Sequence, residues 1–367
     1  MNPETTVREI ALVDRLARGF ARSPHQLNER HESDVELVRV PGTDAVLAIS
    51  TDDIAEEIET GLYKDPYLIG WMTVMVNASD LAAGGADPLG LLVSETLPVG
   101  MTERFLAALQ RGIRDASEAC RIPILGGDTN TGSRLHMGAT VIGVVRQEHP
   151  LTRCGCEPGD LLYATAPLGL GTAFALLQLM VRPARPDGAE AHVTAPVRFL
   201  PQARLSEGIT LAPIASACMD TSDGVLATLD ELMRLNQVGF RLDLPVEYCL
   251  HADALGVARA AGLPAWMMLA GPHGEFELLF TIPPHREAGF ADIARQIGWA
   301  PLRLGRVVSA PTFVLPIESE HRTLDTTRVR NLFAECGGDV HAYREGLFRL
   351  HEELVGVPVA ATSKGMG

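Results

Sequence analysis

The chain has 367 residues, 46% of them hydrophobic and 21% charged, which is the composition of an ordinary soluble globular protein. One hydrophobic core rarely extends over so many residues, so two domains are expected. Acidic residues outnumber basic ones by 46 to 31, and the formal charge of −15 argues against a nucleic-acid or anionic-membrane partner. It does not argue against ATP, because Mg²⁺ bridges carboxylates and phosphates.

Cysteine usage and hydropathy predict a soluble cytoplasmic protein. The six cysteines include no CxxC pair and no spacing typical of a disulfide framework, so reduced thiols are expected. Residues 1–10 do not have the pattern of a signal peptide. The longest apolar run, 168–181, falls short of the ~20 residues that a membrane-spanning helix needs.

The lysine content excludes one common way of binding triphosphates. Only Lys64 and Lys364 occur, and neither follows a glycine-rich loop, so the GxxxxGK[ST] phosphate loop is absent. If the protein handles a triphosphate, metal ions and arginines must neutralise the phosphate charge.

In chain order, the first 150 residues alternate predicted helices and strands. They comprise a helix over 4–20, strands over 35–40 and 45–50, an apolar helix-length run over 67–76, a strand over 91–97, a helix from Thr102 to Cys120, and strands over 122–125 and 137–145. The apolar run leads into Asn77–Pro88, where Asp80 stands before five small residues. Asp80 is interpreted there as a helix cap or as a cation ligand.

A second series of strands and helices follows a change of composition near residues 150–159. Its predicted elements are a strand over 161–165, a helix over 171–181, a long loop over 182–201, a helix after Asp223 capped by Ser222 or Asp223, strands over 276–280, 302–308 and 312–315, and a helical tail over 347–355.

Aspartates recur where predicted strands end or helices begin. They are Asp44, Asp52, Asp80, Asp128, and the pair Asp220 and Asp223. Each alone is readily explained as a cap or turn residue. Together they suit a phosphotransferase, because Mg²⁺ ions held by carboxylates position a triphosphate and neutralise its developing charge.

Short motifs in this order resemble the thiamine-monophosphate kinase family, within the superfamily of aminoimidazole ribonucleotide (AIR) synthetase and selenophosphate synthetase. The resemblance covers residues 9–330. It is carried by Gly42–Val46, Ser50–Asp52 with Glu56, Asn77–Ala83, Gly126–Thr129, Leu151–Arg153, Asp220–Gly224 and Glu277–Thr281.

The resemblance implies an α/β (α+β) fold with two domains. Residues 1–150 would form an ATP- and Mg²⁺-binding domain and residues 151–342 a C-terminal αβ domain, with a helical extension over 343–367. The N-terminal sheets of two copies would pair into a barrel, making the protein a homodimer that acts on a small molecule.

The resemblance also implies roles for individual residues. Metal ligands would be Asp44, Thr51, Asp52, Asp80, Asp128, Asp220 and Asp223. The ATP-binding residues would be Asp44, Thr51, Asp52, Asn77, Asp80, Gly126, Gly127, Asp128, Thr129 and Ser222. Asp223 and Arg153 would be catalytic, with Arg153 near the transferred or acceptor phosphate, and Glu56, Glu275 and Glu277 would contact the substrate.

Several positions depart from the family pattern. Thr43 stands where the family has the first of two adjacent aspartates, Glu59 where it has a histidine, and Pro272–Glu277 where it has Gly-Gly-Glu-Asp-Tyr-Glu. Most of these departures fall on the acceptor side, so ATP use is better supported than thiamine phosphate as the acceptor.

Three functional hypotheses remain at this point. The first is an ATP- and Mg²⁺-dependent kinase acting on a small acceptor that is itself phosphorylated or not; for a hydroxyl or amine acceptor, Asp223 or Glu275 is the candidate base. The second is a synthetase or dehydratase that activates an amide-type oxygen. The third, motivated by Thr43, is a nucleotide-binding relative without turnover.

Overall fold

The structure is a computed structural model that describes all residues except 1–6, 147–149, 181–196, 318–319 and 357–367. Its described helices are α1 (Arg8–Ala17), α2 (Ala55–Glu59), α3 (Pro66–Ala83), α4 (Glu103–Cys120), α5 (Leu170–Leu179), α6 (Leu205–Leu211), α7 (Val225–Asn236), α8 (Ala252–Ala260), α9 (Glu287–Gln296), α10 (Thr326–Glu335) and α11 (Val340–Val355), with 3₁₀ turns η2 (Val246–Tyr248), η3 (Ala265–Leu269) and η4 (Pro284–Arg286). No helix in these described ranges is long and apolar enough to cross a membrane.

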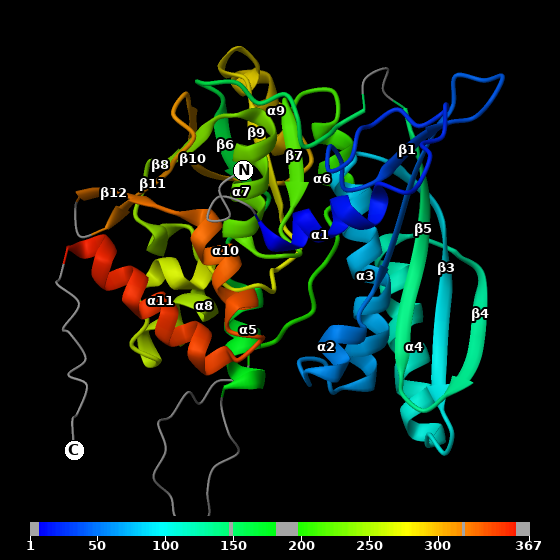
Figure 1. Ribbon diagram of the computed structural model, residues 1–367. Helices are drawn as coiled ribbons and strands as arrows, with labels where there is room; N and C mark the ends of the chain where they lie inside the picture. The colour runs from blue at the N-terminus through cyan, green and yellow to red at the C-terminus, as the bar shows by residue number, and fades with distance from the viewer. Residues whose placement is uncertain (1–6, 147–149, 181–196, 318–319, 357–367) are drawn as a thin grey trace, which may run out of the picture.

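The described strands form two sheets (Figure 1). The first has the order β1-β2-β5-β3-β4 and the second β12-β11-β8-β10-β6-β9-β7. Their strands are β1 (Glu36–Arg39), β2 (Val46–Asp53), β3 (Asp87–Pro98), β4 (Ile124–Gly132), β5 (His136–Val145), β6 (Leu161–Ala164), β7 (Ala217–Asp220), β8 (Gly239–Leu242), β9 (Leu278–Ile282), β10 (Leu302–Val308), β11 (Phe313–Ile317) and β12 (Glu320–Leu324). The mixed α/β architecture agrees with the predicted fold class.

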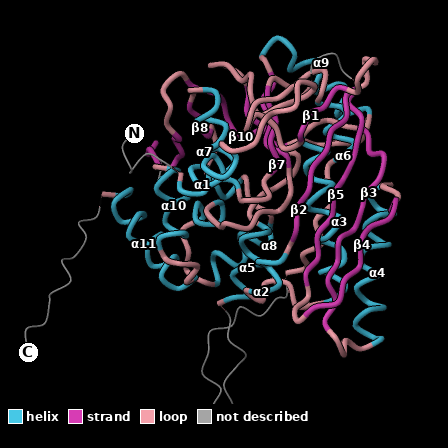
Figure 2. The backbone as a smooth tube through the Cα atoms, turned by 45° about the vertical axis from the view of Figure 1, so that its right-hand side comes forward, coloured by secondary structure: helices cyan, strands magenta, loops and turns pink. Residues whose placement is uncertain are grey.

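The first sheet is covered on one face only. Figure 2 shows α3 and α4 on the same side of the sheet, with strands exposed on the other. The side chains of β5 alternate accordingly, since Met137, Ala139 and Val141 are buried while Thr140 and Ile142 are only partly covered. A sheet with one open face has apolar and polar residues in alternation, which explains the sequence pattern of β5.

Helix α3 is the central element of the N-terminal half. Pro66 occupies its first turn and the Asp65 side chain accepts a hydrogen bond from the Tyr67 N–H, so the start of the helix is well capped. It crosses α4 at two glycines: a Cβ on Gly70 would lie 2.0 Å from the Leu109 carbonyl oxygen, and a Cβ on Gly112 would lie 2.1 Å from the Tyr67 carbonyl oxygen. The two backbones therefore touch where both residues lack a side chain.

Some local predictions were wrong. Asn77–Ala83 is the last part of α3, so Asp80 does not cap a helix start. Gly126–Asp128 is not a turn but the interior of β4, and α7 begins after Gly224 without a side-chain cap from Ser222 or Asp223. The predicted loop over 182–201 lies largely outside the described residues, and α11 starts before the predicted tail helix. At Asp80 and at Gly126–Asp128, packing against the rest of the fold overrode a locally plausible cap or turn.

The second sheet supplies the core of the C-terminal half. The short strands β6, β7 and β9 are buried along their whole length, which fits their largely apolar sequences. Its outermost strand β7 also makes contacts with α3 of the other half. The end of β7 therefore lies beside the last turns of α3, and this junction positions the candidate site.

Candidate active site

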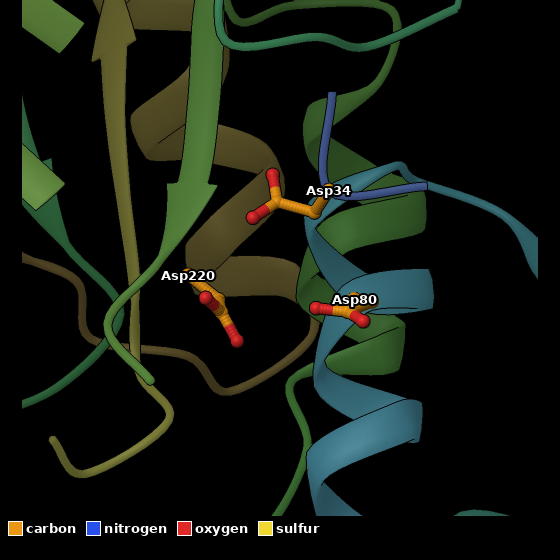
Figure 3. Close-up of side chains that lie close together, drawn as sticks. All are labelled: Asp34, Asp80 and Asp220. Carbon is orange, nitrogen blue, oxygen red and sulfur yellow. The ribbon is translucent and has the colours of Figure 1, made fainter. Parts of the chain in front are cut away.

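Three aspartates from distant parts of the sequence meet at this junction (Figure 3). Asp34 precedes β1, Asp80 lies in the last turn of α3, and Asp220 is the final residue of β7. One carboxylate oxygen from each lies within 4.8 Å of the others. Carboxylate oxygens at this spacing are suited to a hard divalent cation such as Mg²⁺.

Hydrogen bonds from hydroxyl groups fix two of these carboxylates. The Ser79 hydroxyl, next to Asp80 on α3, donates to Asp220 at 2.5 Å, and Ser222 donates to the other oxygen of Asp220 at 2.8 Å. The Ser50 hydroxyl on β2 donates to Asp80. The polar residues around the predicted acids therefore orient them, and the Ser79 bond joins the two halves of the chain.

Burial and mutual repulsion change the acidity of the cluster. The pKa of Asp80 is raised well above its ordinary value, first by burial and then by the negative charges of Asp52 and Asp220. Burial and the nearby Asp34 raise the pKa of Asp220 to about 7, although the Ser79 and Ser222 hydrogen bonds oppose the shift. A divalent cation bound here would offset the repulsion between these carboxylates.

Asp52, Asn77 and Arg153 border the cluster. Asp52 lies near enough to Asp80 to raise the pKa of that carboxyl group, and its backbone N–H donates to the Asn77 side chain at 3.1 Å. The Arg153 guanidinium donates to Asp34 at 2.9 Å, and the Asp34 side chain is only 2% exposed. Burial alone would lower the pKa of Arg153, but the charge and hydrogen bond of Asp34 raise it above its ordinary value. Arg153 is therefore the positive group beside the acids.

Asp34 was not predicted as a site residue. The predicted acids stand where strands end or helices begin, whereas Asp34 stands just before β1. The family motif was predicted at Thr43–Asp44, which the structure puts in the exposed turn between β1 and β2. Asp44 precedes Asp52 by eight residues of extended chain, about 26 Å, so the two cannot share an ion within one protomer. An acid directly before the predicted strand over 35–40 was the signal available for Asp34.

Asp128 also lies apart from the cluster within one protomer. The strand register aligns it with Ser94, Gly138 and Asp53, so about 14 Å of sheet separates β4 from β2. Gly127, the residue before Asp128, is paired with Val93, which packs against the core. Successive residues of a strand point to opposite faces, so Asp128 faces the open side of the sheet.

Other residues predicted to bind ATP are divided between the two faces of the same sheet. Thr51 faces the open side, where its hydroxyl accepts a hydrogen bond from Thr140 at 3.0 Å. Thr129 lies on the opposite side and donates to Glu95 at 2.9 Å. Gly126 and Gly127 sit inside β4, and a Cβ on Gly127 would lie 1.9 Å from the Val93 carbonyl oxygen. Close packing against β3 therefore explains why position 127 is a glycine.

Two of the predicted substrate-binding glutamates have buried protein partners. Glu277 forms an ion pair with Arg204, whose Nε lies 2.7 Å from it. Glu275 accepts a hydrogen bond of 3.0 Å from the Gly169 N–H at the start of α5. Its burial and the neighbouring Glu277 raise the pKa of Glu275 to about 8. Both side chains are thus placed to hold the fold together around the site.

A cavity of about 530 Å³ is lined by residues from both halves of the chain. Asp223, three residues after Asp220, contributes to its wall together with Glu56 and Glu57 of α2. The remaining wall consists mainly of apolar side chains from α5, η3 and α11. The cavity is large enough for a small-molecule substrate.

Comparison with known proteins decides the family. Residues 32–145 match the model of the AIR synthase related protein, N-terminal domain. The thiamine-monophosphate kinase of Escherichia coli strain K12 is 31% identical over 262 residues, which are 71% of this chain and 78% of that enzyme. The chain belongs to the thiamine-monophosphate kinase family. It is accordingly an ATP-dependent phosphotransferase, as the first hypothesis held.

Solved structures agree with the fold. Protein tt0281 from Thermus thermophilus is 28% identical and superposes with a TM-score of 0.69 over 84% of this chain and 96% of its own. AaThiL complexed with AMPPCP and TMP, at 21% identity, has the same fold, with a TM-score of 0.66 over 86% of this chain and 95% of its own. Both superpositions extend over nearly the whole length of those proteins.

Proposed function

We propose that this member of the thiamine-monophosphate kinase family transfers the γ-phosphoryl group of ATP to the phosphate of thiamine monophosphate. The named activity of the Escherichia coli relative supports this acceptor. An acceptor phosphate is already anionic, so the reaction needs no strong general base. The described site accordingly relies on carboxylates and one arginine.

The observation that carries the proposal is the buried cluster of Asp34, Asp80 and Asp220. Three carboxylates with a single adjacent guanidinium leave a net negative charge in a place with little water, and Mg²⁺ fits that charge and those oxygen donors. These residues, with Asp52, would hold Mg²⁺, which supplies charge neutralisation of the triphosphate when bound. Arg153 orients Asp34 and keeps a fixed positive charge beside the phosphates.

The acceptor is assigned to the 530 Å³ cavity. Asp223 lines both this cavity and a second one of about 230 Å³, and it follows the cluster residue Asp220 by three residues. An acceptor in the cavity would direct its phosphate toward the cluster. The apolar wall would enclose the rest of the molecule and exclude water from the transfer.

We also propose that two copies pair through the open face of the first sheet. That face carries Thr51 and Asp128, which sequence motifs assign to ATP but which lie on the opposite side from Asp80 within one protomer. Pairing two sheets face to face would cover the partly exposed Leu92 and bring the second copy's residues toward the nucleotide.

Transfer of radiolabelled phosphate from ATP to thiamine monophosphate tests this function directly. The expected result is a labelled thiamine diphosphate that requires Mg²⁺ and disappears in the Asp80→Asn variant. Release of inorganic phosphate alone, at a rate independent of thiamine monophosphate, would contradict it.

A further inference from the structure

The charges that line the 530 Å³ cavity are mainly negative. Glu56, Glu57 and Asp223 contribute three carboxylates, while Arg344 of α11 is the one arginine among the described lining residues. The rest of the surface is largely apolar and includes Leu62, Leu176, Met267 and Leu347. An apolar wall with an excess of carboxylates is complementary to an organic cation.

Glu57 is distinguished from its neighbours on α2. It is only partly exposed, and no hydrogen bond or ion pair from another residue to its carboxylate is found in the described part of the chain. Burial, opposed by its own backbone N–H and reinforced by the charges of Glu56, Asp53 and Asp223, raises the pKa of Glu57 to about 7. Glu59, by contrast, is exposed, lies outside the cavity wall and pairs with Arg134 at 2.7 Å. Glu57 therefore pays a desolvation cost that no protein cation offsets within the described residues.

A second polar group in the same wall also lacks a partner. His273 is 6% exposed, and its Nδ1 has no hydrogen-bond partner among the described residues. Its Nε2 lies 2.6 Å from the Tyr63 hydroxyl, which comes from the segment after α2. The ring is thus fixed between the two halves of the chain, and burial lowers the pKa of His273 to about 4, so it stays neutral. An unpartnered buried ring nitrogen in the same cavity wall as an unpartnered carboxylate indicates a ligand with its own polar groups.

We propose that Glu57 is a specificity-determining residue that binds the positively charged ring of the acceptor. The assignment rests on the proposed function, because thiamine monophosphate carries a permanent positive charge on its thiazolium ring. With its phosphate directed toward the Asp34, Asp80 and Asp220 cluster, the ring enters the cavity wall that Glu57 and Asp223 supply from opposite halves of the chain.

Calorimetric binding to the full chain at pH 8 tests the assignment. The probes are unphosphorylated thiamine and an isostere whose thiazolium is replaced by neutral thiophene. Glu57→Gln is expected to weaken thiamine binding about tenfold and to leave the neutral isostere unchanged, while Glu57→Asp restores part of the affinity. Glu59→Gln, on the same helix, is the matched control and is expected to bind both probes as the wild type does.

The outcomes separate this inference from the proposed function. Equal loss of both probes in Glu57→Gln, or no loss of thiamine, overturns the role of Glu57 even if thiamine monophosphate is phosphorylated. Charge-dependent binding that requires Glu57, without phosphorylation of thiamine monophosphate, sustains the cation site and refutes the acceptor. No thiamine binding to the wild type refutes the cation site, whatever the phosphoryl-transfer assay shows. In a kinetic assay the variant is expected to raise KM for thiamine monophosphate without changing KM for ATP, which a merely structural role would not produce.

Discussion

Asp80 combines burial with two acidic neighbours, so its negative charge is costly in the absence of a cation. Asp80→Asn is therefore expected to lower kcat for phosphoryl transfer at least about 100-fold while leaving the metal-free protein equally stable or about 1 kcal/mol more stable. Steady-state kinetics and urea unfolding without Mg²⁺ measure the two effects. Asn keeps an oxygen that accepts the Ser50 hydrogen bond.

A control for Asp80→Asn is Asp253→Asn, an exposed change in α8 that should alter neither quantity appreciably. A variant that loses activity because it has lost stability would contradict the assignment of Asp80 to the metal.

The contribution of Glu275 to the free energy of unfolding depends on pH. Its pKa is about 8 in the folded protein against an ordinary 4.5, so the folded state holds a proton that the unfolded state releases between these values. The contribution to stability is therefore lost as pH rises from about 5 to 8, by an amount on the order of a few kcal/mol. Glu275→Gln does not titrate and is expected to flatten the curve of unfolding free energy against pH. Identical pH curves for the two proteins would show that Glu275 is charged in the fold.

At the residue scale, the sequence identified Asp52, Asp80 and Asp220 because their motifs are local. It left out Asp34, which stands directly before a predicted strand but whose role depends on Arg153 and on contact with α3 and β7. It also assigned Glu277 to substrate although the side chain is engaged by Arg204, a contact between residues 73 positions apart. The roles of Asp34 and Glu277 thus depend on side chains that are distant in the sequence.

The crossing of α3 and α4 gives a prediction at the scale of elements. Gly70→Ala places a methyl group 2.0 Å from the Leu109 carbonyl oxygen, which cannot move without displacing α4. We expect a loss of about 3 kcal/mol in unfolding free energy, measured with urea. Gly289→Ala in α9 is the matched control because its Cβ meets nothing within 4 Å, and it should be neutral or slightly stabilising. Equal effects of the two changes would mean that the helices are not in backbone contact.

Most elements of the N-terminal half were predicted from periodicity, although their boundaries were not. In the C-terminal half, no prediction was made for α6, β7, β8, α8, α9, β12 or α10. β5 was predicted over 137–145 and spans His136–Val145, because its alternation reflects one buried face. Asn77–Ala83 was separated from α3 because its polar and small residues look like a helix end. They remain helical since the surrounding sheet and β7 give each polar group a partner, which no local pattern reveals.

At the scale of the whole molecule, the open sheet face predicts association. Leu92→Arg introduces a charge at a position that is 38% exposed in one copy and would be covered in a pair. It is expected to convert a dimer into a folded monomer with greatly reduced phosphoryl transfer, observed by light scattering and activity assay. Ile293→Arg, similarly exposed on α9, should leave both unchanged. A wild-type protein that is monomeric at micromolar concentration would rule out the pairing.

The meeting of Asp34, Asp80 and Asp220 also has a consequence for biosynthesis. These residues lie between positions 34 and 220, and Ser79 bonds to Asp220 only once α3 and β7 have docked. A nascent chain that has emerged up to α6 therefore has no complete cation cage, however well its first sheet has formed. Nucleotide capture becomes a late event in maturation, and a truncated product released from the ribosome would not sequester ATP.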